Sequence, residues 1–320
     1  MKSFSRILSV IDPTVEVQPA MHRAAWLASS TGAELELFIC YYNEYMSGDR
    51  FFDSNSLSAA RREVLEGYEK YLEQLAEPLR NDGIKVTTAA TWDHPLHEGI
   101  VRHAAAIDAD MVFKDTHHHS TFTRTLLTNT DWNLIRACAS PLWLVKSIDL
   151  RGKPVIIAAI DPMNVNDKPA ALDDEILGIS KALAGATGGS VHAFHSYDPR
   201  IAVASATANA YIPVSLPFDE IEKEMRALHE KRFNEITEFH EIDRDKLHLV
   251  SGLTNEELPE LARKLDASVV VMGAVARNRL KQLFVGATAE RTLEHLPCDL
   301  VIIKPDWFRT PVGVERDAAA

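Results

Sequence analysis

The chain has 320 residues, a formal net charge of −12 at pH 7 and 46% hydrophobic residues. This acidic balance argues against a general nucleic-acid-binding surface, because contacts to phosphates need clustered Lys and Arg. No apolar run is long enough to cross a bilayer, and the N-terminal residues enter a strand instead of a signal peptide. We therefore expect a cytoplasmic protein without a membrane partner.

The first half alternates between predicted strands and helices. Apolar residues at helical spacing predict a helix from Gln18 to Thr31, which Gly32 ends. The elements expected after it are the strand Leu35–Tyr41, the helix Ser58–Leu79, the strand Ile84–Thr91, the helix Leu96–Ile107 and the strand Asp110–Lys114. Short apolar strands that alternate with helices are typical of a parallel sheet covered on both faces.

The second half repeats this order. Its expected elements are Asp173–Ala186, Ser190–His195, Phe218–Phe239, Leu247–Val250, Leu258–Leu265 and Ser268–Met272. Each half opens with an apolar strand that ends in Asp-Pro (Asp12-Pro13 and Asp161-Pro162) and closes with an apolar strand that ends in Lys146 or Lys304. We predict one domain over residues 1–148, a second over residues 152–308, and a C-terminal tail over residues 309–320.

The most informative loop follows the strand Ser268–Met272. Gly273 comes directly after the strand, and Gly286 lies further along the same loop, before a helix. A glycine at the carboxyl end of a strand lets the backbone approach a phosphate, and a helix N-terminus offers free N–H groups to an anion. The alternatives are a turn that ends the strand at Gly273, and close packing or a helix entry at Gly286.

The paired Asp-Pro strands, this glycine loop and the closing strands resemble the universal stress protein family, specifically its tandem E-type members. The loop is similar to the family signature G-x2-G-x9-G-[ST], although Ala276 replaces the second glycine and Ala287 replaces the hydroxyl residue. The resemblance implies two open, doubly wound parallel-sheet domains (Rossmann-like, adenine nucleotide α-hydrolase-like). It also implies a pseudo-two-fold axis and an intramolecular pseudo-dimer formed through the last strands. A homodimer of the whole chain stays open.

The resemblance further implies a site for ATP or another adenine nucleotide, with Mg²⁺ as an accompanying ion, in the second domain. The residues that match this site are Asp161, Gly273, Ala276, Arg277, Gly286, Ala287 and Thr288. Asp161 would lie beside the adenosine, Arg277 would add positive charge, and the Thr288 hydroxyl would partly replace the one missing at Ala287. The alternative for Asp161 is a turn or a helix cap, which is natural for Asp before Pro.

The first half lacks this loop. Alignment of the closing strands places Asp115, His118, Thr128 and Asn129 at the four motif positions, so no glycine remains and Asp115 brings negative charge. We therefore expect no phosphate site in this half, and we expect Asp12 to have a turn or packing role.

The same first-half loop contains His117, His118 and His119. Imidazoles from this loop and from His94, His97 or His103 could converge on zinc, with Asp115 or Asp93 as a carboxylate ligand. Consecutive histidines cannot easily all point at one ion, however, and no H-E-x-x-H spacing occurs. We expect solvated loop histidines and no metal centre.

Three functions stay open at this level. The favoured one is a stress-response or regulatory protein that binds an adenine nucleotide in its second domain and acts on unknown partner proteins. The first alternative is an interaction or small-ligand-binding protein in which both pockets have diverged. The least favoured is a metal-binding hydrolase that uses the histidine loop. No nucleophile–base pair can be assigned, so we expect no enzymatic activity beyond slow ATP hydrolysis.

Overall fold

The computed structural model describes residues 4–46, 54–116, 127–146, 152–163, 171–200, 217–274, 292–293 and 295–313. The first half contains β1 (Arg6–Val10), α1 (Pro19–Thr31), β2 (Glu34–Tyr41), the 3-10 helix η1 (Glu44–Met46), α2 (Ser54–Asn81), β3 (Val86–Trp92), α3 (Leu96–Ala106), β4 (Met111–Asp115), α4 (Asn129–Ala137) and β5 (Leu142–Val145). The second half contains β6 (Val155–Ala159), α5 (Ala171–Thr187), β7 (Ser190–Tyr197), α7 (Phe218–Phe239), the 3-10 helix η2 (Arg244–Lys246), β8 (Leu247–Ser251), α8 (Thr254–Lys264), β9 (Val269–Gly273) and β10 (Asp299–Ile303).

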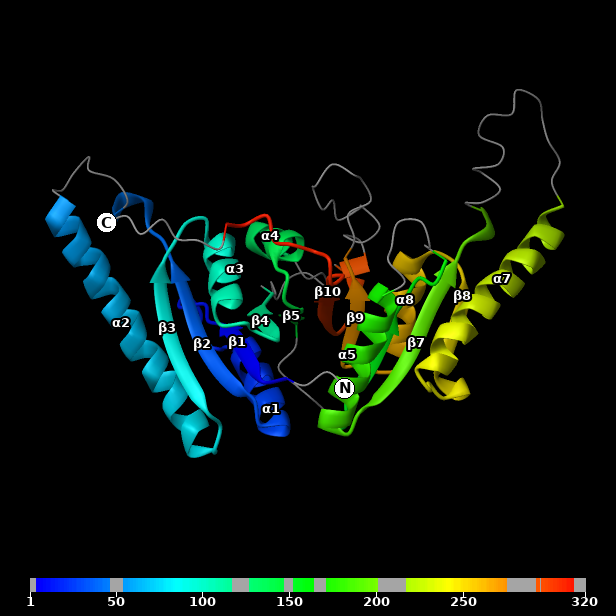
Figure 1. Cartoon of the computed structure of the whole chain (residues 1–320), viewed down its shortest axis with the longest axis horizontal. Coiled ribbons are helices and arrows are strands. Elements are labelled where there is room, and N and C mark those ends of the chain that lie inside the picture. Colours follow the sequence, from blue (N-terminus) through cyan, green and yellow to red (C-terminus); the bar gives the residue numbers. More distant parts are fainter. Residues whose placement is uncertain are drawn as a thin grey trace, which may run out of the picture.

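These strands form one 10-stranded sheet in the order β3-β2-β1-β4-β5-β10-β9-β6-β7-β8. Neighbouring strands are parallel within each half, and only β5 and β10 pair antiparallel. The second five strands therefore repeat the order of the first five in reverse, with β5 and β10 at the centre and the long helices α2 and α7 at opposite ends (Figure 1). The predicted fold class is confirmed: two tandem, doubly wound α/β domains are joined through their last strands.

The junction of the two halves has local two-fold symmetry. Trp143 and Val301 occupy equivalent positions in the two repeats, and they pair with each other across β5 and β10. The Nζ of Lys146 donates to the carbonyl oxygen of Leu293, and the Nζ of Lys304 donates to that of Ile135. The lysine after each closing strand thus donates to a carbonyl group in the last helical segment of the other half. A positive charge is favourable there, because the carbonyl groups at a helix C-terminus carry partial negative charge.

The junction also contains a buried carboxylate that breaks the symmetry. Asp299 is 1% exposed and accepts from the Nε of Arg23 at 2.7 Å, the indole N–H of Trp143 at 3.0 Å and the backbone N–H of Lys146 at 2.9 Å. The equivalent residue in the first repeat is Pro141, which has no carboxylate. This network ties α1 and β5 of the first half to β10 of the second.

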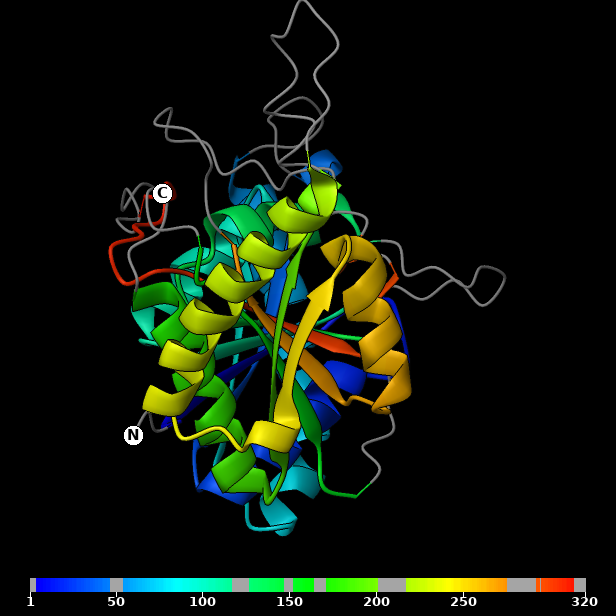
Figure 2. The same ribbon diagram turned by 90° about the vertical axis from the view of Figure 1, so that its right-hand side faces the viewer.

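Helices cover both faces of the sheet. One apolar cluster packs the first face against α1, α2, α5 and α7, and the other packs the opposite face against α3, α4 and α8. Adjacent strand residues alternate between the clusters, as Ile7 and Leu8 do in β1. Figure 2 shows α7 and α8 on opposite sides of the end of the sheet, with β8 between them.

The predicted elements occur in the expected order, with some changed ends. Helix α8 begins at Thr254 instead of Leu258, although Pro259 lies inside it, because Glu256 and Glu257 in the first turn favour the helix dipole. The sequence periodicity did not predict α4, which is short and polar and begins with a capping box. Among the described residues, no helix is both long and apolar enough to cross a membrane.

Candidate functional site

The carboxyl edge of the second domain brings two of the predicted site residues together. β6 and β9 are adjacent and parallel, with Ala159 opposite Met272. Asp161 follows β6, and Gly273 is the last residue of β9, so both lie where these neighbouring strands end. Open α/β sheets bind ligands at such an edge, outside the carboxyl ends of the strands.

Gly273 has a packing reason to be a glycine. A Cβ added there would lie 2.7 Å from Cδ2 of Leu172 and 3.3 Å from Cδ1 of Ile176, both in α5. A larger residue would therefore have to displace the side chains of Leu172 and Ile176. Close packing explains this glycine, while its predicted role beside a phosphate stays a prediction.

Asp161 is partly buried, and its backbone N–H donates to Oδ1 of Asp173 at 3.2 Å. Within the described residues, no hydrogen bond reaches its carboxylate. Its first-domain equivalent differs, because Oδ1 of Asp12 accepts from the backbone N–H of Thr14 at 2.8 Å and from its hydroxyl at 2.6 Å. Asp12 thus forms the expected turn. The matching position after Asp161 is Met163, which has no side-chain donor.

A histidine pair that the sequence reasoning missed lies beside Asp161. Nδ1 of His195 lies 3.1 Å from the carbonyl oxygen of Ile160, and its Nε2 lies 2.7 Å from Nδ1 of His229. A carbonyl oxygen only accepts, so Nδ1 of His195 carries the proton and, in the neutral ring, Nε2 accepts from His229. Burial lowers the pKa of His229, and the charge of Asp161 opposes that effect.

The geometry gives this pair a defined position. His195 is 3% exposed, and the ring of Tyr197 stacks on His229 with the centroids 4.7 Å apart. The sequence signal was the strand alternation, which places His195 on the same face of β7 as Val191 and Ala193. The pattern could not reveal His229 as its partner, because that contact depends on how α7 docks.

The remaining predicted residues of the nucleotide loop lie outside the described residues. They are Ala276, Arg277, Gly286, Ala287 and Thr288. The loop histidines His117, His118 and His119 also lie outside them. Among the residues that the structure does describe, no group of three or more His, Cys, Asp or Glu side chains could hold a metal ion.

The same edge of the first domain carries carboxylates at two helix N-termini. Asp115, which aligns with Gly273, accepts at Oδ1 from the backbone N–H of Ala20 in the first turn of α1, at 2.7 Å. Burial raises the pKa of Asp115 to about 7, against the lowering effect of that hydrogen bond and of Lys114. The carboxyl group thus occupies the kind of position that an anionic ligand would take.

The second carboxylate caps α4. Oδ2 of Asp131 accepts from the backbone N–H of Thr128 at 2.7 Å, while the backbone N–H of Asp131 donates to the Thr128 hydroxyl at 3.2 Å. Lys114 Nζ lies 2.7 Å from Oδ1 of Asp131, which is fully buried. Thr128 and Asn129 therefore begin a helix whose N-terminus already has its own anion, and the nearby lysine already has a partner.

A duplicated, doubly wound α/β unit with its ligand edge at the carboxyl ends of the strands defines a class of tandem, two-domain α/β proteins. The sequence model of the Universal stress protein family matches residues 3–146 and 156–304, and the chain belongs to that family. The chain is similar to Universal stress protein E of Escherichia coli (strain K12), with 28% identity over 321 residues and 99% of each chain covered.

Other relatives agree with this assignment. Universal stress protein E of Photorhabdus laumondii is 24% identical over 322 residues, which cover 99% of this chain and 100% of the relative. A functionally unknown protein from Pseudomonas aeruginosa PAO1 superposes with a TM-score of 0.72 at 24% identity, covering 95% of this chain and 93% of that one. A universal stress protein from Archaeoglobus fulgidus gives 0.63 at 15% identity, covering 93% and 98%. These structures show the shared fold.

Proposed function

We propose that this chain is a stress-response protein whose second domain binds an adenine nucleotide at the carboxyl ends of β6 and β9. The observation that carries the proposal is the carboxylate of Asp161. It is free of hydrogen bonds from the described residues, whereas Asp12 is bound to Thr14. A carboxylate in this state can accept from the two hydroxyl groups of a ribose.

The phosphates would lie on the loop after Gly273, with Arg277 as the nearby cation and Thr288 as a hydroxyl donor. In this proposal the first domain binds no nucleotide, because the carboxyl groups of Asp115 and Asp131 already occupy the N-termini of α1 and α4. The output is a change of conformation that a partner protein reads in the cytoplasm, without turnover beyond slow ATP hydrolysis.

Native mass spectrometry of gently purified protein, before and after addition of ATP and Mg²⁺, tests the proposal. We expect one nucleotide per chain. Asp161→Asn should weaken binding about tenfold, since a hydrogen bond to a charged group contributes about 1.5–3 kcal/mol. Asp12→Asn is the matched control and should leave the affinity unchanged. A Gly273 variant is a poor test, because it would also displace Leu172.

The second candidate function is a protein in which both pockets have diverged from nucleotide binding. The packing of Gly273 on Leu172 favours it, because that contact gives the glycine a role that needs no ligand. Absence of bound nucleotide at millimolar ATP would overturn the nucleotide proposal and leave this candidate. Equal loss of binding in Asp161→Asn and Asp12→Asn would contradict the assignment to the second domain.

A further inference from the structure

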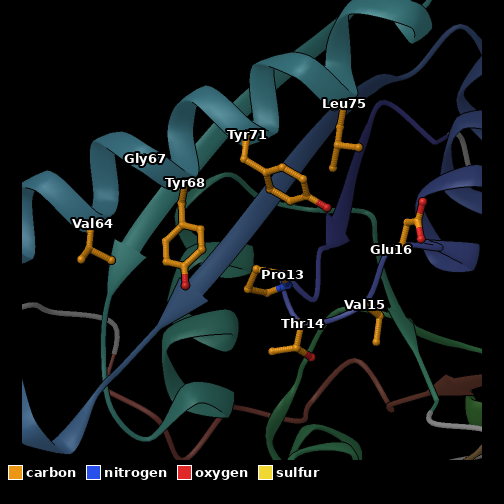
Figure 3. Close-up of a pocket in the computed structure, with 9 residues that line it drawn as sticks. All are labelled: Pro13, Thr14, Val15, Glu16, Val64, Gly67, Tyr68, Tyr71 and Leu75. Carbon is orange, nitrogen blue, oxygen red and sulfur yellow. The ribbon is translucent and has the colours of Figure 1, made fainter.

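A cavity of about 600 Å³ lies in the first domain, away from the proposed nucleotide site. It separates the segment after β1 from the face of α2 (Figure 3). The lining residues are Pro13, Thr14, Val15, Glu16, Val64, Gly67, Tyr68, Tyr71 and Leu75. Its volume is in the range of small-molecule pockets.

The rings of Tyr68 and Tyr71 form the α2 side of this cavity. In Figure 3 both project from α2 towards the segment that holds Pro13 and Thr14. Val64 and Leu75 extend the same side with apolar groups. An aromatic or branched apolar group of a ligand would therefore find rings on one side and Pro13 on the other.

The charge of the lining is one-sided. Glu16 is the charged side chain among these lining residues, and no ion pair to it occurs within the described part of the chain. The carboxylate of Asp12, which precedes Pro13 and accepts from the backbone N–H of Thr14, adds to the negative potential. An anionic ligand is disfavoured here, and a cation gains from both the carboxylate and the tyrosine faces.

A cation already lies on an aromatic ring next to this cavity, at the N-terminal part of α2. The guanidinium of Arg61 lies over the ring of Trp92 at 5.2 Å from the centroid. Tyr68 makes a tilted contact with Tyr41 at 4.9 Å, and no cation of the described residues lies over Tyr68 or Tyr71. The ring faces of these two tyrosines thus lack the partner that Trp92 has.

We propose that the cavity between residues 13–16 and α2 binds a small organic cation, an amine carried on an aromatic or branched apolar group. The apolar part packs against Tyr68, Tyr71, Val64 and Leu75, and the ammonium group lies towards Glu16. This site belongs to the first domain and does not depend on nucleotide binding in the second.

Three probes that share one skeleton test the ligand class: phenylpropylamine, phenylpropanol and phenylpropanoate, titrated against the full chain by ligand-observed NMR. We expect the amine to bind about tenfold more tightly than the alcohol, and the carboxylate to bind most weakly. Glu16→Gln should bring the amine close to the alcohol. Equal affinity of the three probes, or no binding of the amine, would overturn the proposal.

Two glycine variants locate the site. Gly67 is exposed on α2, and a Cβ there meets no atom within 4 Å, so Gly67→Phe should fold and place its ring in the cavity. Gly185 in α5 is also exposed with the same open surroundings and lies outside the cavity lining, so Gly185→Phe is the matched control. Amine binding should be lost in the first and kept in the second. Unchanged binding in Gly67→Phe, with an unchanged melting temperature, would contradict the location.

Discussion

The carboxyl edges of the two domains have the same strands and different charges. In the first domain, carboxylates of Asp115 and Asp131 bind the N-termini of α1 and α4, and Lys114 pairs with Asp131. In the second domain, Gly273 stands in the place of Asp115, and the carboxylate of Asp161 has no hydrogen bond from the described residues. The two copies thus share one scaffold, but in the first copy the domain's own carboxyl groups occupy the helix N-termini that a ligand could contact.

At the junction of the two halves, the extra carboxylate belongs to the second repeat instead of the first. Here the second half supplies the carboxylate, Asp299, and the first half supplies Pro141 in its place. Residues at equivalent positions of the two repeats can therefore differ in charge and in partners. Substitution of the carboxylate in each pair measures its contribution to the free energy of unfolding.

The largest effect is expected at Asp299. Asp299→Ala should lower the free energy of unfolding by about 3–5 kcal/mol, because Arg23 is 3% exposed and its buried charge would lose the carboxylate that its Nε contacts at 2.7 Å. Urea denaturation followed by circular dichroism measures the loss. The double variant Arg23→Met with Asp299→Leu should recover much of it, and a single-variant loss below about 1 kcal/mol would contradict a buried-charge effect.

A smaller, pH-dependent effect is expected at Asp115. Its folded-state pKa of about 7 is above the usual value, so the unfolded chain loses this proton first as the pH rises. The wild type should therefore lose about 2–4 kcal/mol of stability between pH 4 and pH 7, in addition to other groups. Asp115→Asn keeps an oxygen acceptor for the backbone N–H of Ala20 but does not titrate, so its stability should not fall through this group as the pH rises.

Denaturation midpoints of both proteins across this pH range check the sign. The difference between Asp115→Asn and wild type should grow through pH 7 and level off about one pH unit above it. Parallel curves would mean that Asp115 titrates as an ordinary surface carboxyl and that the first-domain edge is more open than its burial indicates.

The smallest effect is expected at the cap of α4. Thr128→Ala should cost about 1 kcal/mol, because the backbone N–H of Asp131 loses its acceptor. Thr128→Ser keeps the hydroxyl and should stay within a few tenths of a kcal/mol of wild type. Hydrogen exchange at the first amides of α4 gives the local readout, and equal protection in both variants would show that Asp131 alone caps the helix.

The sequence predicted the features that depend on local pattern and on the repeat. Strand alternation and helix spacing predicted the order of elements, and the resemblance to the family implied that the last strands, β5 and β10, would meet. Asp161 and Gly273 were placed at one edge because parallel neighbours end on the same side of a sheet.

The features that escaped prediction depend on side chains far apart in the chain. Arg23 and Asp299 are 276 positions apart, and nothing near either residue indicates the other. His195 meets His229 only through the docking of α7. The sequence reasoning also missed the packing of Gly273 against Leu172 of α5, while the ligand role that it assigned to Gly273 stays a prediction.

The crossed lysines at the centre of the sheet bear on how the two halves stay together. Lys146 and Lys304 each reach into the opposite half, and β5 pairs with β10 between them, so the contact surface does not rely on the covalent linker. The covalent connection between β5 and β6 then acts chiefly by raising the effective concentration of one half near the other. Two separately expressed fragments, divided within this linker, are accordingly a natural starting point for a split, reassembling protein.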